Sequence, residues 1–126
     1  MTAEEMRKVS GGVIGHFTPK ELTVEAKDLI VGANTIGLKV PANKFVYGTY
    51  IKNEADDLAS GGAATVKVTV GSTDTISATA LADLKGKGVA ALDASPDFSA
   101  AEREVKLTVA TAAYTAGKLI VGVIYG

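Results

Sequence analysis

The chain has 126 residues, a formal net charge of −1 and no cysteine, and aromatic residues make up 6% of it. This length suits one domain, the missing cysteines exclude disulfides and thiolate metal sites, and the near-neutral charge argues against a general nucleic-acid binder. Apolar runs fall short of the about 18 residues of a membrane span, and the N-terminus lacks the cations and apolar block of a signal peptide. We therefore expect neither membrane insertion nor export.

The first twelve residues, MTAEEMRKVSGG, form the predicted N-terminal arm. Thr2 and Glu5 have the spacing of a capping box, which favours a short helix that ends at the glycines. Chain ends also fray, and the sequence supports both alternatives equally. Residues 13–126 form the predicted domain, which begins with a short strand at VIGHF, residues 13–17.

Beyond the arm, apolar residues recur mainly with period two, which indicates strands. The segment TIGLKV is a predicted strand that ends at Pro41, because proline cannot donate to a ladder. In the next segment, KFVYGTYIKN, alternation predicts one face made of Phe45, Tyr47, Thr49 and Ile51. A polar loop follows at residues 53–63, and TVKVTVG is then a half-buried strand with Val66, Val68 and Val70 inward.

The last third of the chain contains one helical turn, one loop and two strands in our prediction. Leu81 and Leu84 suit a single turn of helix, which Gly86 breaks. The segment DASPDFSAAERE is a predicted loop, with Pro96 as a stop. EVKLTVAT and KLIVGVIY are strands, and their short connection predicts an antiparallel hairpin.

The terminal strand, KLIVGVIY, is apolar on both faces. Leu119, Val121, Val123 and Tyr125 project to one side, whereas Ile120, Gly122 and Ile124 project to the other. Leaving two isoleucines exposed forgoes about 1.5–3 kcal/mol each. Either a segment of the same chain such as TALADL covers the second face, or a neighbouring subunit does.

Taken together, about seven or eight short strands separated by turns predict an all-β fold. We expect a single-domain antiparallel β-sandwich or jelly-roll-like barrel with an N-terminal arm and at most one short helix.

Residues able to carry chemistry are scarce. His16 is the only histidine and has apolar neighbours, so we interpret it as a structural or interface residue. Glu54, Asp56 and Asp57 form the densest acidic cluster but lack the spacing of a calcium loop. The sequence leaves open whether this loop binds a cation, and it predicts neither an enzyme nor a cofactor.

Three short segments stand out together: VTVGSTDT, the closing EVKLTVATAAYTAGKLIVGVIYG with its Tyr-x-Ala-Gly-Lys turn, and Lys39-Val40-Pro41 after an apolar strand. In this combination they resemble the capsid decoration (cement) proteins of tailed bacteriophages. The resemblance spans roughly residues 29–126 and leaves the arm outside. It implies a β-sandwich that sits on the outer surface of an icosahedral phage head, commonly as a homotrimer, and clamps neighbouring capsomers mechanically.

This resemblance leads to specific expectations. The partners are further copies of the chain and the major capsid protein, with no nucleic acid and no membrane, and the protein is located in the virion after assembly in the bacterial cytoplasm. We expect a subunit interface at Tyr114, Ile120 and Ile124. We expect contact with the capsid or a neighbour through the arm and the residues after it, namely Met6, Val9, His16 and Phe17.

Two alternatives remain from the sequence. One is another phage structural part, such as a neck, tail or fibre component. The other is a carbohydrate-binding β-sandwich, for which Tyr47, Tyr50 and Phe98 are the candidate aromatic platforms.

Overall fold

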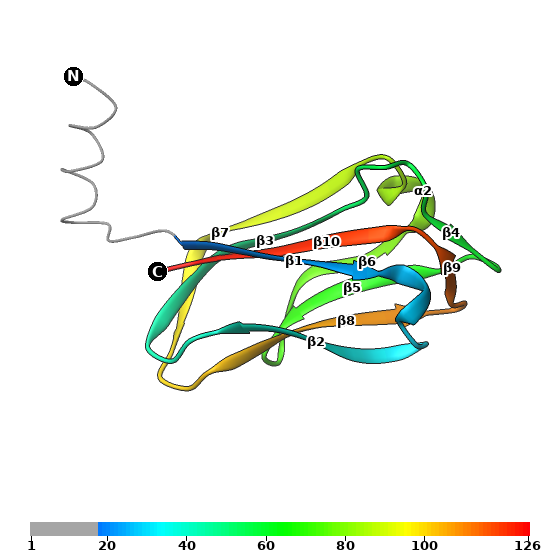
Figure 1. Cartoon of the computed structure of the whole chain (residues 1–126). Helices are drawn as coiled ribbons and strands as arrows, with labels where there is room; N and C mark the ends of the chain where they lie inside the picture. Colours follow the sequence, from blue (N-terminus) through cyan, green and yellow to red (C-terminus); the bar gives the residue numbers. More distant parts are fainter. Residues whose placement is uncertain (1–17) are drawn as a thin grey trace, which may run out of the picture.

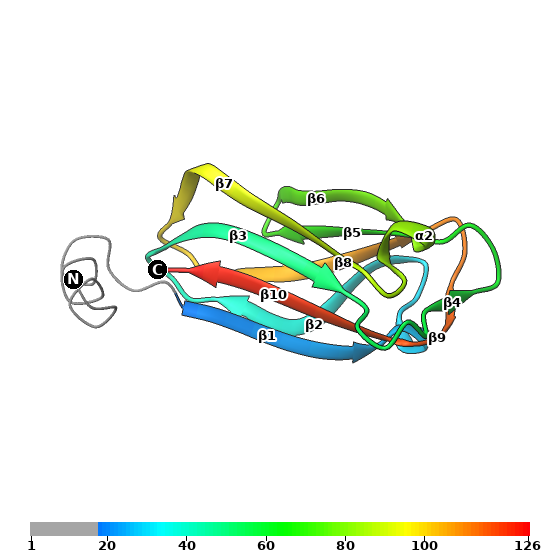
Figure 2. The same cartoon turned by 90° about the horizontal axis from the view of Figure 1, so that it is seen from above.

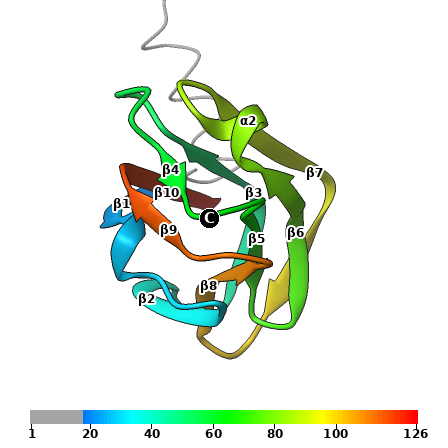
Figure 3. The same cartoon turned by 90° about the vertical axis from the view of Figure 1, so that its right-hand side faces the viewer.

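The fold is a β-sandwich of two antiparallel four-stranded sheets (Figure 1). The computed structural model describes residues 18–126 and, within that range, every side chain except those of residues 93–95. One sheet has the strand order β1-β10-β3-β7 and the other β2-β8-β5-β6. A small two-stranded sheet, β4-β9, lies at one end, as Figure 3 shows. The prediction of an all-β sandwich is confirmed, and the sheets do not close into a barrel.

The strands are β1 (Thr18–Glu25), β2 (Gly32–Val40), β3 (Lys44–Lys52), β4 (Ala59–Ser60), β5 (Thr65–Val70), β6 (Thr73–Ala80), β7 (Gly88–Ser99), β8 (Arg103–Ala110), β9 (Tyr114–Ala116) and β10 (Lys118–Tyr125). A 3-10 turn, η1 (Ala26–Asp28), follows β1, and a single helical turn, α2 (Leu81–Leu84), follows β6. That turn is the predicted short helix. The predicted boundary between arm and domain, at residues 12 and 13, lies outside the described residues.

The core fills the space between the two sheets. Alternation puts Val66, Val68 and Val70 of β5 inward, and all three are buried as predicted. Leu119, Val121 and Val123 of β10, in the other sheet, are each fully buried in the same core. Fully burying such a side chain is worth about 1.5–3 kcal/mol, so these two strands contribute strongly to stability.

Strands β8 and β10 do not form the predicted hairpin. β8 pairs with β2 and β5 in one sheet, whereas β10 pairs with β1 and β3 in the other. The connection between them carries β9 and crosses from sheet to sheet. A short connection fits a hairpin and a sheet crossover equally well, so length alone misled the prediction.

The predicted loop DASPDFSAAERE is wrong for residues 93–99, which belong to the long strand β7, whereas residues 100–102 do connect β7 to β8. β7 is an edge strand that pairs only with β3, and an edge strand tolerates a proline. Moreover, Pro96 lies where the pairing is interrupted, between the Val46↔Asp97 and Gly48↔Leu92 pairs. The proline therefore removes no ladder hydrogen bond from the sheet interior.

The same interruption corrects the predicted face of β3. Thr49 and Ile51 are buried, but Phe45 is exposed and Val46 is buried, so Phe45 does not share a face with Thr49 and Ile51. Tyr47 is the extra residue of a β-bulge, since β10 pairs Ile124 with Gly48 and then Tyr125 with Val46. A bulge shifts the alternation by one residue, so every side chain before it changes face.

Candidate interaction face

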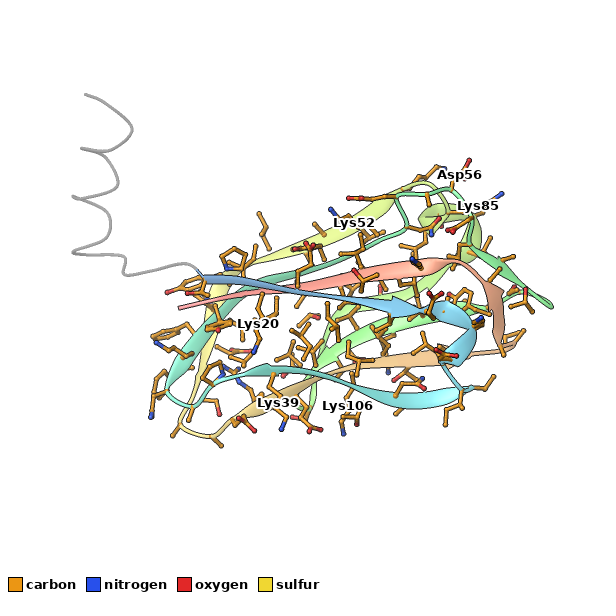
Figure 4. The ribbon with its side chains drawn as sticks, in the orientation of Figure 1. Lys20, Lys39, Lys52, Asp56, Lys85 and Lys106 are labelled. Atoms are coloured by element: carbon orange, nitrogen blue, oxygen red, sulfur yellow. The ribbon has the colours of Figure 1, made fainter. Side chains whose placement is uncertain are left out.

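The two outer faces of the sandwich differ in chemistry. The outer face of the β2-β8-β5-β6 sheet carries Lys39 and Lys106, which point away from the molecule in Figure 4. An ion pair of 3.6 Å joins Lys39 to Glu102, and one of 3.4 Å joins Lys67 to Asp74. This face is polar and suits contact with water.

On the opposite face, formed by the β1-β10-β3-β7 sheet, the side chain of one tyrosine spans three neighbouring strands. Glu21, Gly122 and Tyr50 lie side by side on β1, β10 and β3. The Tyr50 ring crosses above Gly122, and its hydroxyl donates a hydrogen bond to Glu21. Burial, the hydrogen bond to Glu21 and the charge of Glu21 raise the pKa of Tyr50 to about 12. The phenol therefore stays protonated and bridges three strands.

Glycine at position 122 is what permits this bridge. A Cβ atom there would overlap the Tyr50 ring. The chain therefore covers the middle of the terminal strand with a side chain from the adjacent strand, and not with the TALADL segment. That alternative is wrong, because α2 contacts β6 and β7.

Ile120 and Ile124 flank the tyrosine bridge on this face, and both are half-buried. Ile120 lies between Thr23 and Lys52, and Ile124 lies between Pro19 and Gly48. The Lys52 ammonium is 2.7 Å from Glu54 and 5.8 Å from the centre of the Tyr50 ring. β10 is thus a central strand whose inner face is core and whose outer face is partly open.

An aromatic patch, consisting of Phe45, Leu92 and Phe98, lies at one end of the same face. Phe45 pairs with Phe98 across β3 and β7, with ring centres 5.2 Å apart. The Leu92 side chain lies over Gly48. These three side chains are 40%, 78% and 54% exposed, respectively. Large apolar side chains exposed on one face of a domain make that face a candidate interaction surface.

The residues predicted as an interface are distributed differently from the expectation. Ile120 and Ile124 lie on the outer face just described. Tyr114 is 2% exposed and belongs to the core of its own chain, so its ring is not accessible to a neighbour. Burial raises the pKa of Tyr114 to about 12. Met6, Val9, His16 and Phe17 lie outside the described residues.

The predicted acidic loop is organised by a buried asparagine that the sequence analysis did not identify. The Asn53 amide nitrogen donates to Asp57 and to the Lys118 carbonyl, at 2.8 Å each. Its oxygen accepts from the backbone N–H groups of Asp57 and Gly86 at 3.2 and 3.1 Å. The hydrogen bond from Asn53 holds the pKa of Asp57 below its usual value. Within residues 18–126, no three acidic or histidine side chains gather closely enough to hold a metal ion.

A cleft of about 240 Å³ opens between the facing edges β6 and β7, and its lining includes Asp74, Asp97 and Arg103. The Arg103 guanidinium donates to the Lys44 carbonyl at 2.8 Å. Arg103 therefore ties β8 to the start of β3 across the sandwich edge, which is a structural role. Within the described range, no helix has the length and apolarity needed to cross a membrane.

Comparison with solved structures places this fold among phage capsids. The chain matches a chain of the cyanophage Pam1 capsid asymmetric unit with 21% identity and a TM-score of 0.62, over 87% of this chain and 84% of that one. It matches a chain of the acid-stable capsid of Helicobacter pylori bacteriophage KHP30 with 15% identity and a TM-score of 0.56, over 86% of both chains.

A third match, in the capsid of Ralstonia phage GP4, has 21% identity and a TM-score of 0.54, over 88% of this chain and 83% of that one. The chain shares its fold with chains of phage capsids. No protein-family profile and no curated protein matches the sequence. At these identities the likeness concerns the fold alone.

Proposed function

We propose that this protein is a virion structural protein, a capsid decoration (cement) protein that binds the outer surface of an icosahedral phage head. The observation that carries the proposal is the fold shared with three phage capsid chains. In each match, similar shares of both chains are covered, so the matched chains are about as small as this one. The likeness is therefore to a small chain as a whole and not to one domain of a large protein.

The proposed action is mechanical, without turnover. Copies of the chain associate as a homotrimer and bind the major capsid protein, so that each bound trimer stabilises contacts between capsomers. No contact with nucleic acid or a membrane is part of this role. The asymmetry of the sandwich supports it, because one outer face is polar whereas the other carries Ile120, Ile124 and the aromatic patch.

Within this proposal, Ile120 and Ile124 contribute to the subunit interface. Both are partly covered by their own sheet, and a neighbouring subunit would bury the remainder of each side chain. The residues Met6, Val9, His16 and Phe17 are proposed to contact the capsid or a neighbouring copy. A segment that becomes ordered on contact can cover a large surface at a modest net affinity.

The decisive experiment adds the purified protein to phage heads that lack a decoration protein and images the particles by electron microscopy. The expected result is density at regular positions on the outer surface, with trimers at junctions between capsomers. Heads that stay bare at every protein concentration would overturn the proposal. Binding to purified tails or necks would support the alternative structural role, and specific binding on a glycan array would support a carbohydrate-binding module.

The interface is tested separately with Ile120→Lys and its matched control Ala33→Lys. Ala33 is exposed on the outer face of the other sheet, so the control adds the same charge away from the proposed interface. Ile120→Lys is expected to yield monomers with a normal thermal transition, whereas the control remains oligomeric in analytical ultracentrifugation. Unchanged oligomers for Ile120→Lys would remove this residue from the interface.

A further inference from the structure

The aromatic patch poses a specific physical problem. Phe45, Leu92 and Phe98 all lie on the outer face of the β3-β7 pair, and each is at least 40% exposed. No residue among 18–126 buries them further. Apolar side chains exposed on one face promote self-association, so an occupant for this surface is expected in the free protein.

The described chain begins next to this patch. Thr18, the first residue of β1, pairs with Tyr125. The following residue, Gly126, exchanges two backbone hydrogen bonds with Phe45, at 2.9 and 3.0 Å. Figure 2 shows the start of β1, the C-terminus and the start of β3 at the same end of the sandwich.

The distance from Thr18 to the patch is short. Neighbouring strands lie about 4.8 Å apart, so Phe45 is about 10 Å from Thr18, two strand spacings across the sheet. An extended residue spans up to about 3.3–3.6 Å. Three or four residues before Thr18 therefore suffice to reach Phe45, and the segment VIGHF, residues 13–17, supplies five.

The chemistry of this segment matches the surface. Val13, Ile14 and Phe17 are aliphatic and aromatic, and aromatic pairs gain about 0.5–1.5 kcal/mol beyond their burial. A short tether also gives the segment an effective concentration of the order of millimolar at the patch. A second copy of the chain at micromolar concentration cannot compete with that value unless its intrinsic affinity is much higher.

We propose that residues 13–17 cover the aromatic patch of their own chain in the free protein. The surface that is covered consists of Phe45, Leu92 and Phe98 of the sandwich, and the residues just before Thr18 pack against it. This contact shields the patch from other copies until the protein assembles.

The absence of native cysteine allows a direct test by disulfide trapping. One variant combines Ile14→Cys with Leu92→Cys, and its matched control combines Ile14→Cys with Lys39→Cys, which lies on the outer face of the other sheet near the end of the sandwich where β1 begins (Figure 4). Both receptor positions are exposed. Under mild oxidation of dilute protein, the first variant is expected to form an intramolecular disulfide about tenfold faster than the control, as a raised local concentration implies. Intact mass and a non-reducing gel report the products.

Each other outcome overturns the proposal. Equal rates for the two variants would show that the segment does not dwell at the patch. Disulfide-linked dimers through positions 14 and 92 would identify a second copy as the occupant.

Hydrogen exchange gives a second readout on the full chain. The amides of residues 13–17 are expected to exchange more slowly in the native protein than in Phe98→Ser, while Ala33→Lys leaves their exchange unchanged. If the amides of residues 13–17 in the native protein exchange as fast as those of an unstructured peptide, the segment does not contact the aromatic patch. Both measurements use the free protein without phage heads, so their failure leaves the proposed capsid binding untouched.

Discussion

The exchange of Gly117 for alanine tests one of the close backbone contacts of the described residues. Gly117 precedes β10 and has φ +102°, a backbone conformation that residues with a side chain adopt only with strain. A Cβ atom there would lie 2.7 Å from the Leu58 Cα and 3.0 Å from the Asp57 carbonyl oxygen. Leu58 is 1% exposed, so its backbone has little room to move.

Two costs add up in Gly117→Ala. Holding a non-glycine residue at such a φ costs about 1–3 kcal/mol, and forcing an extra atom into a packed site costs about 1–3 kcal/mol. We expect a total loss of about 4 kcal/mol in the free energy of unfolding. With an unfolding entropy of about 2.1 cal/mol/K per residue, each kcal/mol lowers Tm by about 4 °C, so the variant should melt about 15 °C lower.

Gly32→Ala is the matched control. Gly32 has φ +116°, but a Cβ atom there would meet nothing within 4 Å. This variant carries the strain alone and should lose about 1–3 kcal/mol. Urea denaturation followed by circular dichroism measures both values. Equal losses in the two variants would refute the reasoning, because the contact with the Leu58 backbone would then contribute nothing.

Two further predictions concern polar side chains. Asn53→Ala leaves buried backbone groups without partners and should lower the free energy of unfolding, measured by urea denaturation, by about 3 kcal/mol. The variant should also lose less stability than the native protein when the pH is lowered. In the native protein the lowered pKa of Asp57 stabilises the fold above the ordinary pKa of 3.8, and this stabilisation is lost as the pH falls below that value. If the loss of stability at acid pH is unchanged in the variant, the Asn53 contact is not the cause of the lowered Asp57 pKa. The pKa of Tyr50, raised from 10.0 to about 12, stabilises the native fold below pH 10, and this contribution disappears as the pH rises from 10 to 12. Tyr50→Phe should therefore be less stable than the native protein at neutral pH and should lack this alkaline loss. Spectrophotometric titration of the native protein checks this, and a Tyr50 that ionises near pH 10 would contradict the bridge to Glu21.

Part of the candidate face could be predicted from the sequence, and part could not. The two-sided apolar character of β10 was evident, so Ile120 and Ile124 were correctly placed on the face opposite Leu119, Val121 and Val123. The aromatic patch was missed because Phe45 was assigned to the same face as Thr49 and Ile51, which the structure buries. One extra residue, Tyr47, reverses the face of everything before it, and a bulge leaves no sign in the local alternation.

Asn53 and Gly122 were missed for a different reason. Asn53 looks like an ordinary loop residue, and only the fold brings Lys118 and Gly86 within its reach. In the sequence, Gly122 is only a glycine in an apolar strand. The need for glycine there arises because β10 pairs with β3, which places the Tyr50 ring over position 122. Partners distant in sequence decide both roles.

The sequence by itself determined the class of fold and most of the strands, because period-two alternation is a local property that a pleated strand imposes on any half-buried segment. It also determined the short helical turn and the end of β2 at Pro41. Only the tertiary structure decided which strands pair. β8 and β10 lie in different sheets, and Pro96 lies in an edge strand, because pairing depends on long-range packing of both inner faces into one core. The outer face that results, bridged by Tyr50 and apolar at one end, is therefore a product of topology.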